Sequence, residues 1–502
     1  MTRLVHACLA FALLPLAACA TATSGAGTGA PTLTPPVTRA SLAPYIDSLV
    51  GVPEFRNAHW GVLVVDPLNG DTLYARNAGK LFMPASNMKL ITGAVALDRL
   101  GPDYRFATTF AKLGTVADST LNGHLLIYGR GDPSVSDAMQ NDDALAPLRA
   151  VADSLRARGI TRIAGRLMPG GDAFPDAAYG YGWSWDDFHA PYSAGVDELF
   201  FNEGFGRVTV IGGAIAGDSA RIETLPLRSF PAVVAQILTA SEPVTNGDRQ
   251  RPRIRVALDS ATLGVHLTGT IAPNDTFMTR FAYRDQPRAY LMALRQAFQE
   301  RGISVLDSVV TPVGTVDSLF ATQSPPLREI LPVFEKPSQN QIGEILFKTI
   351  ALEATGSGTA DSARRVIARH LTSWGVDTLG FVVRDGSGLS RHDYLSPRAI
   401  VQLLDVMRRH EHFQLFYDAL PIAGVDGTIS NRMRDTPAQG NLRAKTGTLD
   451  KARALSGYVT TADGRLLLFS ALANNYTAPL SDVTQVQDRI GAQLARLRLD
   501  LP

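Results

Sequence analysis

The chain has 502 residues and a formal net charge of +1, from 48 Lys and Arg against 47 Asp and Glu. Single hydrophobic cores stop growing at roughly 250–300 residues, so we expect more than one domain. With 45% hydrophobic and 19% charged residues, the composition excludes a disordered or fibrous chain. No basic stripe or acidic tail stands out, so nucleic acid is not expected as a partner.

The N-terminus has the pattern of an export signal. Arg3 precedes an apolar run over residues 4–16 that is too short to span a bilayer. A Leu-Ala-Ala stretch then precedes Cys19, which is similar to a bacterial lipobox, and Ala20 stands where aspartate would favour the inner membrane. We predict a signal peptide over residues 1–18, lipidation of Cys19, and a periplasmic protein anchored in the outer membrane. An ordinary secretory signal is the alternative.

Cysteine and histidine indicate neither a disulfide nor a metal site. The two cysteines are Cys8 and Cys19, and Cys8 leaves with the signal, so no intramolecular disulfide is expected. His410 and His412 come closest to a ligand pair, but charged residues surround them at a helix end, which favours a solvated face. We expect no metal ion and no organic cofactor.

From Ala20 the chain consists of Ala, Thr, Gly, Ser and Pro with almost no charge, which predicts a flexible tether over residues 19–40. Folded structure is expected from about Ser41. Apolar runs at 59–66 and 72–76 flank a turn and predict a hairpin. Apolar residues at helical spacing then predict a buried helix from Ser86.

Residues 103–318 have a different character. Short β-like runs at 125–128, 254–258 and 311–314 alternate with Gly, Asp and Pro turns. One helix is predicted over residues 143–158. We interpret this stretch as a β-rich insert made of two small modules.

The C-terminal part returns to helices and ends in strands. Helices are predicted over residues 341–354, 360–374, 397–410 and 482–497, and strands over residues 442–448, 454–460 and 465–472. A sheet built from both ends of the chain and flanked by helices predicts one α+β domain. We place this domain at residues 41–102 and 319–502, interrupted by the insert.

The first motif that carries chemistry is Ser86-Asn87-Met88-Lys89. Residues three apart share one face of a helix, so Lys89 is expected beside the Ser86 hydroxyl. A serine is a poor nucleophile until a base takes its proton, and a buried lysine with a lowered pKa can be that base. Alone, this motif occurs by chance in many proteins.

The second motif is Ser338-Gln339-Asn340, expected between a loop over residues 332–337 and a helix that begins at Gln341. Its hydroxyl could relay a proton, and its amide could hold a substrate backbone. A helix N-cap is the alternative interpretation.

The third motif is Lys445-Thr446-Gly447-Thr448, on a strand near the C-terminus. A strand edge offers N–H and C=O groups to an extended peptide. Gly447 is expected to keep that edge open, while Lys445 and Thr446 can bind a carboxylate. An ordinary edge-strand lysine is the alternative.

Together the three motifs are specific, because their order and context match the signature of penicillin-binding proteins and class A β-lactamases. With its long gap between Ser86 and Ser338, the motif spacing is similar to that of the class C low-molecular-mass penicillin-binding proteins. These are the "penicillin-binding protein 4" type of D-alanyl-D-alanine carboxypeptidase/endopeptidase. Further similar stretches are residues 129–133, 182–187, 385–391 and 420–428. The resemblance covers roughly residues 45–495. It implies a penicillin-recognising, β-lactamase-like domain.

The resemblance also implies a mechanism. Ser86 attacks the carbonyl between two D-alanines of a peptidoglycan stem peptide, and water hydrolyses the acyl-enzyme. Lys89 acts as general base, Ser338 passes a proton to the leaving amine with Lys445 tuning that step, and the N–H groups of Ser86 and Thr448 form the oxyanion hole. Asn340 completes the catalytic set. The group that activates Ser86 stays open at this stage, and β-lactams are expected to acylate the same serine.

A side-chain pocket is implied less completely. Arg391 resembles the family's arginine for the far carboxylate of a diaminopimelyl side chain, and Asp450 is expected near it. Phe174 matches a pocket phenylalanine, but Gly170 stands where relatives have an aspartate for the free amine. We therefore expect weaker or differently built recognition, with Asp172, Asp176 or Asp450 as the replacement. Gln339 replaces the usual aspartate of the second motif.

Two alternatives remain on sequence grounds. A β-lactamase-like hydrolase would turn over penicillin rapidly, and it is disfavoured because it leaves no room for the insert. A non-catalytic wall-binding scaffold would keep the fold without turnover, and it is disfavoured because all catalytic side chains are present.

Overall fold

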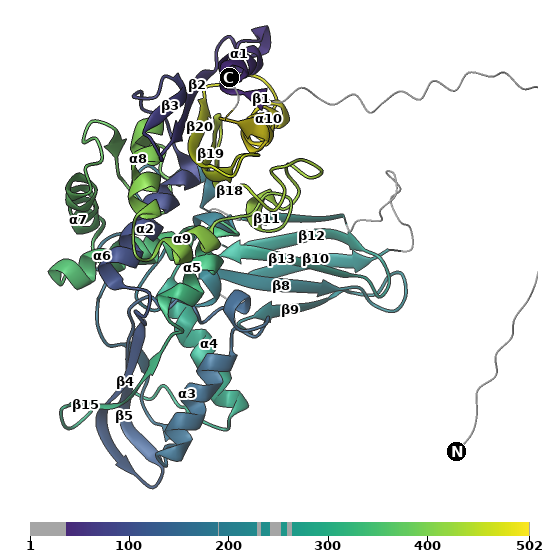
Figure 1. The fold of residues 1–502 in the computed structure, drawn as a ribbon. Coiled ribbons are helices and arrows are strands. Elements are labelled where there is room, and N and C mark those ends of the chain that lie inside the picture. The colour runs from purple at the N-terminus through teal and green to yellow at the C-terminus, as the bar shows by residue number, and fades with distance from the viewer. Residues whose placement is uncertain (1–36, 189, 228–231, 241–252, 259–263, 501–502) are drawn as a thin grey trace, which may run out of the picture. The chain divides into compact units, whose positions relative to one another are not determined.

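The computed structural model describes residues 37–500 apart from 189, 228–231, 241–252 and 259–263 (Figure 1). The predicted signal peptide and Cys19 lie outside the described residues. Among the described residues, no helix is both long and apolar enough to cross a membrane.

Regular structure begins earlier than the tether prediction allows. The strand β1 (Val37–Thr38) pairs in parallel with β21 (Leu497–Arg498), and the helix α1 (Arg39–Val50) follows at once. Leu42, Ile46 and Val50, one helical turn apart, are buried. This apolar stripe is the reason that the helix starts within the predicted tether.

The main sheet has five antiparallel strands in the order β18–β19–β20–β2–β3. Their bounds are β2 (His59–Asp66), β3 (Asp71–Arg76), β18 (Arg443–Leu449), β19 (Ala452–Thr460) and β20 (Leu466–Asn474). The two parts of the chain meet where Val62 of β2 lies opposite Ala471 of β20. The prediction of a sheet built from both ends of the chain is confirmed.

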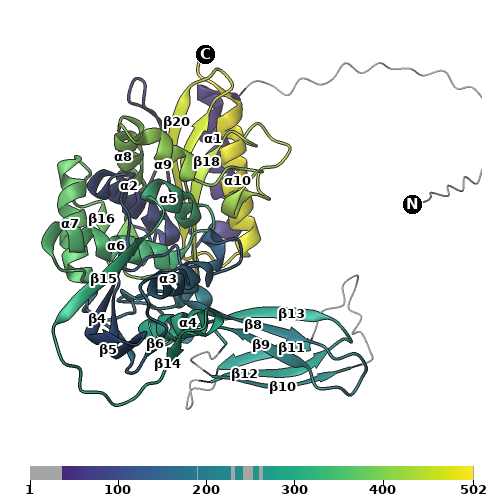
Figure 2. The same ribbon diagram turned by 90° about the horizontal axis from the view of Figure 1, so that it is seen from below.

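Helices cover both faces of this sheet, because successive residues of a strand point to opposite sides. Val62 belongs to the hydrophobic core that includes α1 and α10 (Leu480–Arg496), whereas Leu63 belongs to the core that includes α2 (Met88–Leu100) and α8 (Pro397–Arg408). Figure 2 shows α1 and α10 on one side of the sheet and α2 on the other. The further helices of this domain are α5 (Leu327–Glu335), α6 (Asn340–Thr355), α7 (Ala360–Ser373) and α9 (Phe413–Ala419), with a short ladder of β16 (Phe381–Val382) and β17 (Tyr394–Leu395).

Within the described residues, the insert contains one six-stranded sheet and two three-stranded sheets. The first comprises β4 (Ala107–Ala117), β5 (Thr120–Tyr128), β6 (Arg162–Ile163), β7 (Leu167–Pro169), β14 (Ser304–Val305) and β15 (Val316–Gln323), with α3 (Ala146–Ala157) and α4 (Gln286–Glu300). Two three-stranded sheets follow: β8 (Phe205–Ile211) with β9 (Arg221–Leu225) and β13 (Thr276–Ala282), and β10 (Val233–Thr239) with β11 (Arg253–Leu258) and β12 (Val265–Ile271). Because β15 pairs with β4 as far as Gln323, the insert's sheet extends past residue 318.

Three local predictions are wrong. Residues 311–314 form no strand, and α4 was not foreseen. Residues 332–335, predicted as loop because of Pro332, belong to α5. In α5 the buried Leu327, Ile330, Leu331 and Phe334 recur at helical spacing, and their burial outweighs the hydrogen bond that a proline removes.

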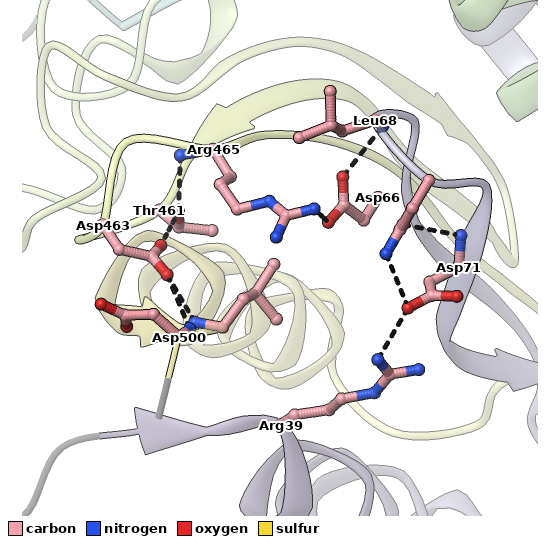
Figure 3. Close-up of polar contacts among 10 residues, drawn as sticks. Arg39, Asp66, Leu68, Asp71, Thr461, Asp463, Arg465 and Asp500 are labelled. Atoms are coloured by element: carbon pink, nitrogen blue, oxygen red, sulfur yellow. Dashed lines mark hydrogen bonds and ion pairs between the residues drawn. The ribbon is translucent and has the colours of Figure 1, made fainter. Parts of the chain in front are cut away.

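Polar contacts tie the first and last parts of the described chain to the turns of the sheet (Figure 3). Asp463 accepts hydrogen bonds from two backbone N–H groups near the C-terminus, at 2.6 and 3.1 Å. Arg465 forms an ion pair with the buried Asp66. Arg39 of α1 binds Asp71 at 2.7 Å. These contacts join α1 and β21 to the β2–β3 and β19–β20 hairpins.

His410 does not lie on a solvated face, contrary to the sequence interpretation. Its Nε2 is 2.8 Å from Asp98 Oδ1, and its side chain is 14% exposed. His370 Nε2 lies 2.9 Å from the other oxygen of the same carboxylate. Nowhere in the described ranges do three or more His, Cys, Asp or Glu side chains gather as a metal site would require.

Candidate active site

Ser86 lies in a single 3₁₀ turn, Ala85–Asn87, that leads directly into α2. Ala85 has a φ of +47°, a conformation that non-glycine residues rarely adopt. Two glycines from distant segments leave room for this turn. A Cβ at Gly388 would collide with the Ala85 carbonyl oxygen, and a Cβ at Gly447 with that of Pro84. The role of Gly447 is therefore close packing of β18 against the turn that carries Ser86.

The turn is also fixed by a hydrogen bond to the third motif. Asn87 is fully buried, and its Nδ2 donates to the Lys445 carbonyl oxygen at 2.8 Å. This contact joins the first motif to β18. The position of Ser86 relative to the strand is therefore set by buried structure.

Lys89 is fully buried on the first turn of α2, and its amine has three neighbours. Nζ lies 2.9 Å from Ser86 Oγ, 2.6 Å from Asn340 Oδ1 and 2.7 Å from the Ser387 carbonyl oxygen. Asn340 Nδ2 donates to the Tyr192 carbonyl oxygen at 2.8 Å, so its Oδ1 must be the atom that faces Lys89.

These three contacts suit a neutral amine. Asn340 Oδ1 and the Ser387 carbonyl can only accept, so they take the two N–H groups of a neutral Lys89. The lone pair is then left for the Ser86 hydroxyl. Burial, followed by the positive charge of Lys445, lowers the pKa of Lys89 to about 7. Near neutral pH, Lys89 is therefore able to accept the proton of Ser86.

The second and third motifs meet at Ser338. This serine has a φ of +65°, and its Oγ accepts a hydrogen bond of 2.8 Å from Lys445 Nζ. Lys445 is fully buried, and burial lowers its pKa. Lys445 Nζ also donates to the Thr446 carbonyl oxygen at 3.2 Å. The Ser338 hydroxyl thus has a proton donor directly behind it.

Gln339 has a structural role. It is the N-cap residue of α6, and its side-chain oxygen accepts from Ile342 N at 3.1 Å. The capping interpretation therefore holds for the middle residue of the motif, while Ser338 and Asn340 face the lysines. Helix α6 begins at Asn340.

The motif residues open onto one cleft of about 630 Å³. Of the residues singled out in the sequence, the cleft is lined by Ser86, Ser338, Asn340, Arg391, Thr446, Gly447, Thr448 and Asp450. Lys89 and Lys445 lie beneath it, bound to Ser86 and Ser338. The arrangement places a serine, a basic amine, a second hydroxyl and a strand edge together, and these are the groups that acyl transfer through a serine uses.

Comparison with known proteins agrees with this chemistry. Residues 42–497 match the D-Ala-D-Ala carboxypeptidase 3 (S13) family. The D-alanyl-D-alanine carboxypeptidase of Actinomadura sp. (strain R39) is 32% identical over 473 residues, with 90% of this chain and 84% of that protein covered.

The chain belongs to the S13 family.

Two further relatives come from Haemophilus influenzae. The D-alanyl-D-alanine carboxypeptidase DacB is 25% identical over 435 residues, covering 82% of this chain and 84% of that protein. The crystal structure of penicillin binding protein 4 matches with a TM-score of 0.74 at 23% identity, over 90% of this chain and 99% of that chain. The α+β fold and the assignment to serine-type D-Ala-D-Ala carboxypeptidases are confirmed.

Phe174 is not brought into the cleft of this S13 chain. Its side chain is 3% exposed and packs where Cβ atoms at Gly131 and Gly358 would touch its ring. Gly170 does not line the cleft either. A Cβ at Gly170 would lie 2.6 Å from the Tyr128 ring, so an aspartate there would disturb packing and add no charge to the cleft.

Of the three replacement carboxylates that the sequence offers, Asp450 alone lines the cleft. Asp176 is committed elsewhere, because it pairs with Lys348 at 2.5 Å and accepts from Ala360 N at 2.6 Å. Arg391 stands beside Asp450, since its Nη1 is 3.5 Å from the Asp450 carbonyl oxygen, and its Nε donates to Ser184 Oγ at 3.1 Å.

The sequence missed several cleft residues, which are Asp186, Asp187, Tyr192, Gly388, Leu389, Thr428 and Leu449. Asp187 accepts a hydrogen bond of 2.6 Å from the Tyr192 hydroxyl. Asp186 and Asp187 belong to a stretch, 182–187, whose likeness to the family was visible, but nothing in that likeness indicated which side chains reach the cleft.

Proposed function

We propose that this S13 peptidase cleaves the D-Ala-D-Ala end of peptidoglycan stem peptides through an acyl-enzyme on Ser86. The observation that carries the proposal is the fixed pair of acceptors on Lys89, Asn340 Oδ1 and the Ser387 carbonyl. They accept the two N–H groups of the neutral amine, so its lone pair faces the Ser86 hydroxyl, 2.9 Å away. β-Lactams would acylate the same serine, because their strained amide occupies the position of the scissile peptide bond.

The proposed reaction has two halves. Lys89 takes the proton of Ser86 as Oγ attacks the carbonyl carbon of the penultimate D-alanine, and the N–H groups of Ser86 and Thr448 stabilise the oxyanion. The C–N bond then breaks, and the leaving amine receives, through the Ser338 hydroxyl that Lys445 supports, the proton that Lys89 took from Ser86, so Lys89 is neutral again. In the second half, water gives its proton to Lys89 as it attacks the ester carbonyl, and Lys89 returns that proton to Ser86 Oγ as the ester C–O bond breaks.

Hydroxyl groups at the end of β18 would hold the terminal carboxylate of the substrate. Thr446 Oγ1 lies 2.7 Å from Thr428 Oγ1, and Thr448 is exposed at the cleft. The positive charge of Lys445 lies directly below these groups. This set would bind the carboxylate of a D-alanine and the carboxylate of a penicillin in the same way.

The direct test is D-alanine release. Purified protein is mixed with a pentapeptide that ends in D-Ala-D-Ala. In a second assay it is mixed with a cross-linked peptide dimer in which D-alanine occurs only within the cross-link. Release of D-alanine from the first establishes the carboxypeptidase, and separation of the dimer establishes the endopeptidase. Release that persists in Ser86→Ala, or no release from either substrate, would contradict the proposal.

The proposed location rests on the sequence. We infer that Cys19 carries lipid and anchors the protein in the outer membrane, facing the periplasm where the substrate lies. In the Cys19→Ser variant, labelled fatty acid should not enter the protein, and the chain should be either uncleaved or soluble in the periplasm. Unchanged membrane fractionation of this variant would favour the ordinary secretory signal.

A further inference from the structure

Glu335 is a fully buried carboxylate at the end of α5, three residues before Ser338. Neither of its side-chain oxygens has a hydrogen-bond partner in the part of the chain that the structure describes. Its backbone carbonyl accepts from Ser338 N at 3.3 Å. A buried carboxylate without a partner is costly, so its presence beside the second motif requires an explanation.

Helix α2 leaves a space for this carboxylate. A Cβ at Gly93, four residues after Lys89 on the same helix, would lie 2.7 Å from Glu335 Oε1. The helix therefore has its glycine where the acidic group packs against it. Glu335 therefore packs against the helix that carries Lys89, and its backbone binds Ser338, the residue that accepts from Lys445.

The electrostatic surroundings of Glu335 consist of the two active-site lysines. Burial raises the pKa of the Glu335 carboxyl, and the positive charges of Lys445 and Lys89 act in the opposite direction. Lys336, the next residue, is held by Asp426 at 2.6 Å and the Leu420 carbonyl oxygen at 3.2 Å. The carboxylates of Asp385 and Glu344 also act on Lys89, whereas burial and the carboxylate of Glu335 act on Lys445.

We propose that Glu335 is a positioning residue that acts through its charge: its buried carboxylate balances the Lys445 ammonium, so that Lys445 stays protonated beside the neutral Lys89. In that state the buried group of two lysines and one glutamate has no net charge. Loss of the carboxylate would leave the Lys445 cation uncompensated in a dry site. Glu335 touches neither Ser86 nor substrate and acts through the lysines. This inference rests on the proposed acylation of Ser86.

The test is the pH profile of acylation in Glu335→Gln. A carboxylate favours the charged form of a neighbouring lysine, so its removal lowers the pKa of both lysines. The acidic limb, which follows deprotonation of Lys89, and the alkaline limb, which follows loss of the Lys445 charge, should both move to lower pH by about one unit. Rates of β-lactam acylation are measured from pH 5 to 10 and normalised to the number of acylable sites, so partial unfolding does not affect them.

Two variants serve as controls. Glu329→Gln removes the same charge from an exposed position on the same helix, and it should not shift the pH profile of acylation. Glu335→Asp keeps the carboxylate and should retain most of the wild-type profile. If Glu335→Gln does not fold, Glu335→Leu replaces the carboxylate by an apolar side chain of similar size, with the same expected shift.

The outcomes separate the two proposals. Wild type that is acylated normally, together with Glu335→Gln or Glu335→Leu whose limbs stay within 0.2 pH units or move to higher pH, would overturn the role of Glu335 and leave the proposed function intact. Wild type that is acylated at no pH would overturn both.

Discussion

Lys89 and Lys445 are fully buried, and each binds a motif hydroxyl and a backbone carbonyl. By contrast, Arg391 and Asp450 in turns, and Asp187 at the end of a short 3₁₀ helix, line the open surface of the same cleft. The buried region is fixed by close packing, because Gly388 and Gly447 pack against the strained turn that carries Ser86. The exposed region is held by few contacts. We infer that the buried region sets the reaction and the exposed region sets the choice of side chain, and each prediction below tests that division.

The largest effect is expected for Lys89→Arg. Arginine stays protonated in proteins, so it cannot take the Ser86 proton. Acylation by a β-lactam should fall by about 10²–10⁴-fold, the usual contribution of a general base. Stopped-flow acylation measures this loss, with Lys112→Arg, a partly exposed lysine paired with Asp317, as the control. A folded Lys89→Arg variant that keeps more than a tenth of the rate would mean that another group takes the proton.

A single methyl group at Gly447 should also be damaging. Its Cβ would collide with the Pro84 carbonyl oxygen and lie 3.1 Å from Ala85 Cβ, so the turn that carries Ser86 must move. Displacement of a reacting group by about 1 Å costs on the order of 10²-fold in rate. The measurement compares acylation of Gly447→Ala with that of Gly79→Ala, where the new Cβ meets nothing within 4 Å. Equal rates would show that the packing of β18 does not position the nucleophile.

The pH dependence of the wild-type acylation rate should follow the protonation of the buried Lys89. Lys89 must be neutral to act, and burial and Lys445 lower its pKa to about 7. Below that pKa the amine becomes protonated, so acylation should fall about tenfold for each pH unit. The profile is measured with a chromogenic β-lactam at constant ionic strength. An acidic limb centred above pH 9 would indicate a lysine with an ordinary pKa and contradict the neutral-base assignment.

The smallest effect is expected in the exposed region. Ion pairs at exposed positions are worth about 0–1 kcal/mol, so Asp450 and Asp187 should give a peptide with a free diaminopimelyl amine only a few-fold advantage in kcat/KM over a neutral one. Asp450→Asn and Asp187→Asn should each reduce that advantage, while Asp172→Asn, outside the cleft lining, should not. A wild-type preference above about 100-fold would show that the side-chain pocket is built more tightly than this.

Much of the buried region could be predicted from the sequence. The apolar spacing of α2 and α6, and the glycines that end them at Gly101 and Gly356, are local signals. Three motifs in a fixed order then place Ser86, Lys89, Ser338 and Lys445 together, as the hydrogen bonds of the structure show.

The remainder depends on packing between distant segments. The sequence predicts a loop at Glu335 because Pro332 obscures α5, whose formation depends on buried contacts. The space for the Ser86 turn is left by Gly388 and Gly447, which are far from it in sequence. Asp186, Asp187 and Tyr192 reach the cleft from the insert, and no periodicity in a loop indicates where its side chains will lie.

The central claim, that Ser86 is the nucleophile, is tested most directly by intact-mass measurement after incubation with benzylpenicillin, followed by peptide mapping. We predict one adduct per chain, located on the peptide that contains Ser86, and no adduct in a folded Ser86→Ala variant. Full labelling of Ser86→Ala, or an adduct on any other peptide, would contradict the account.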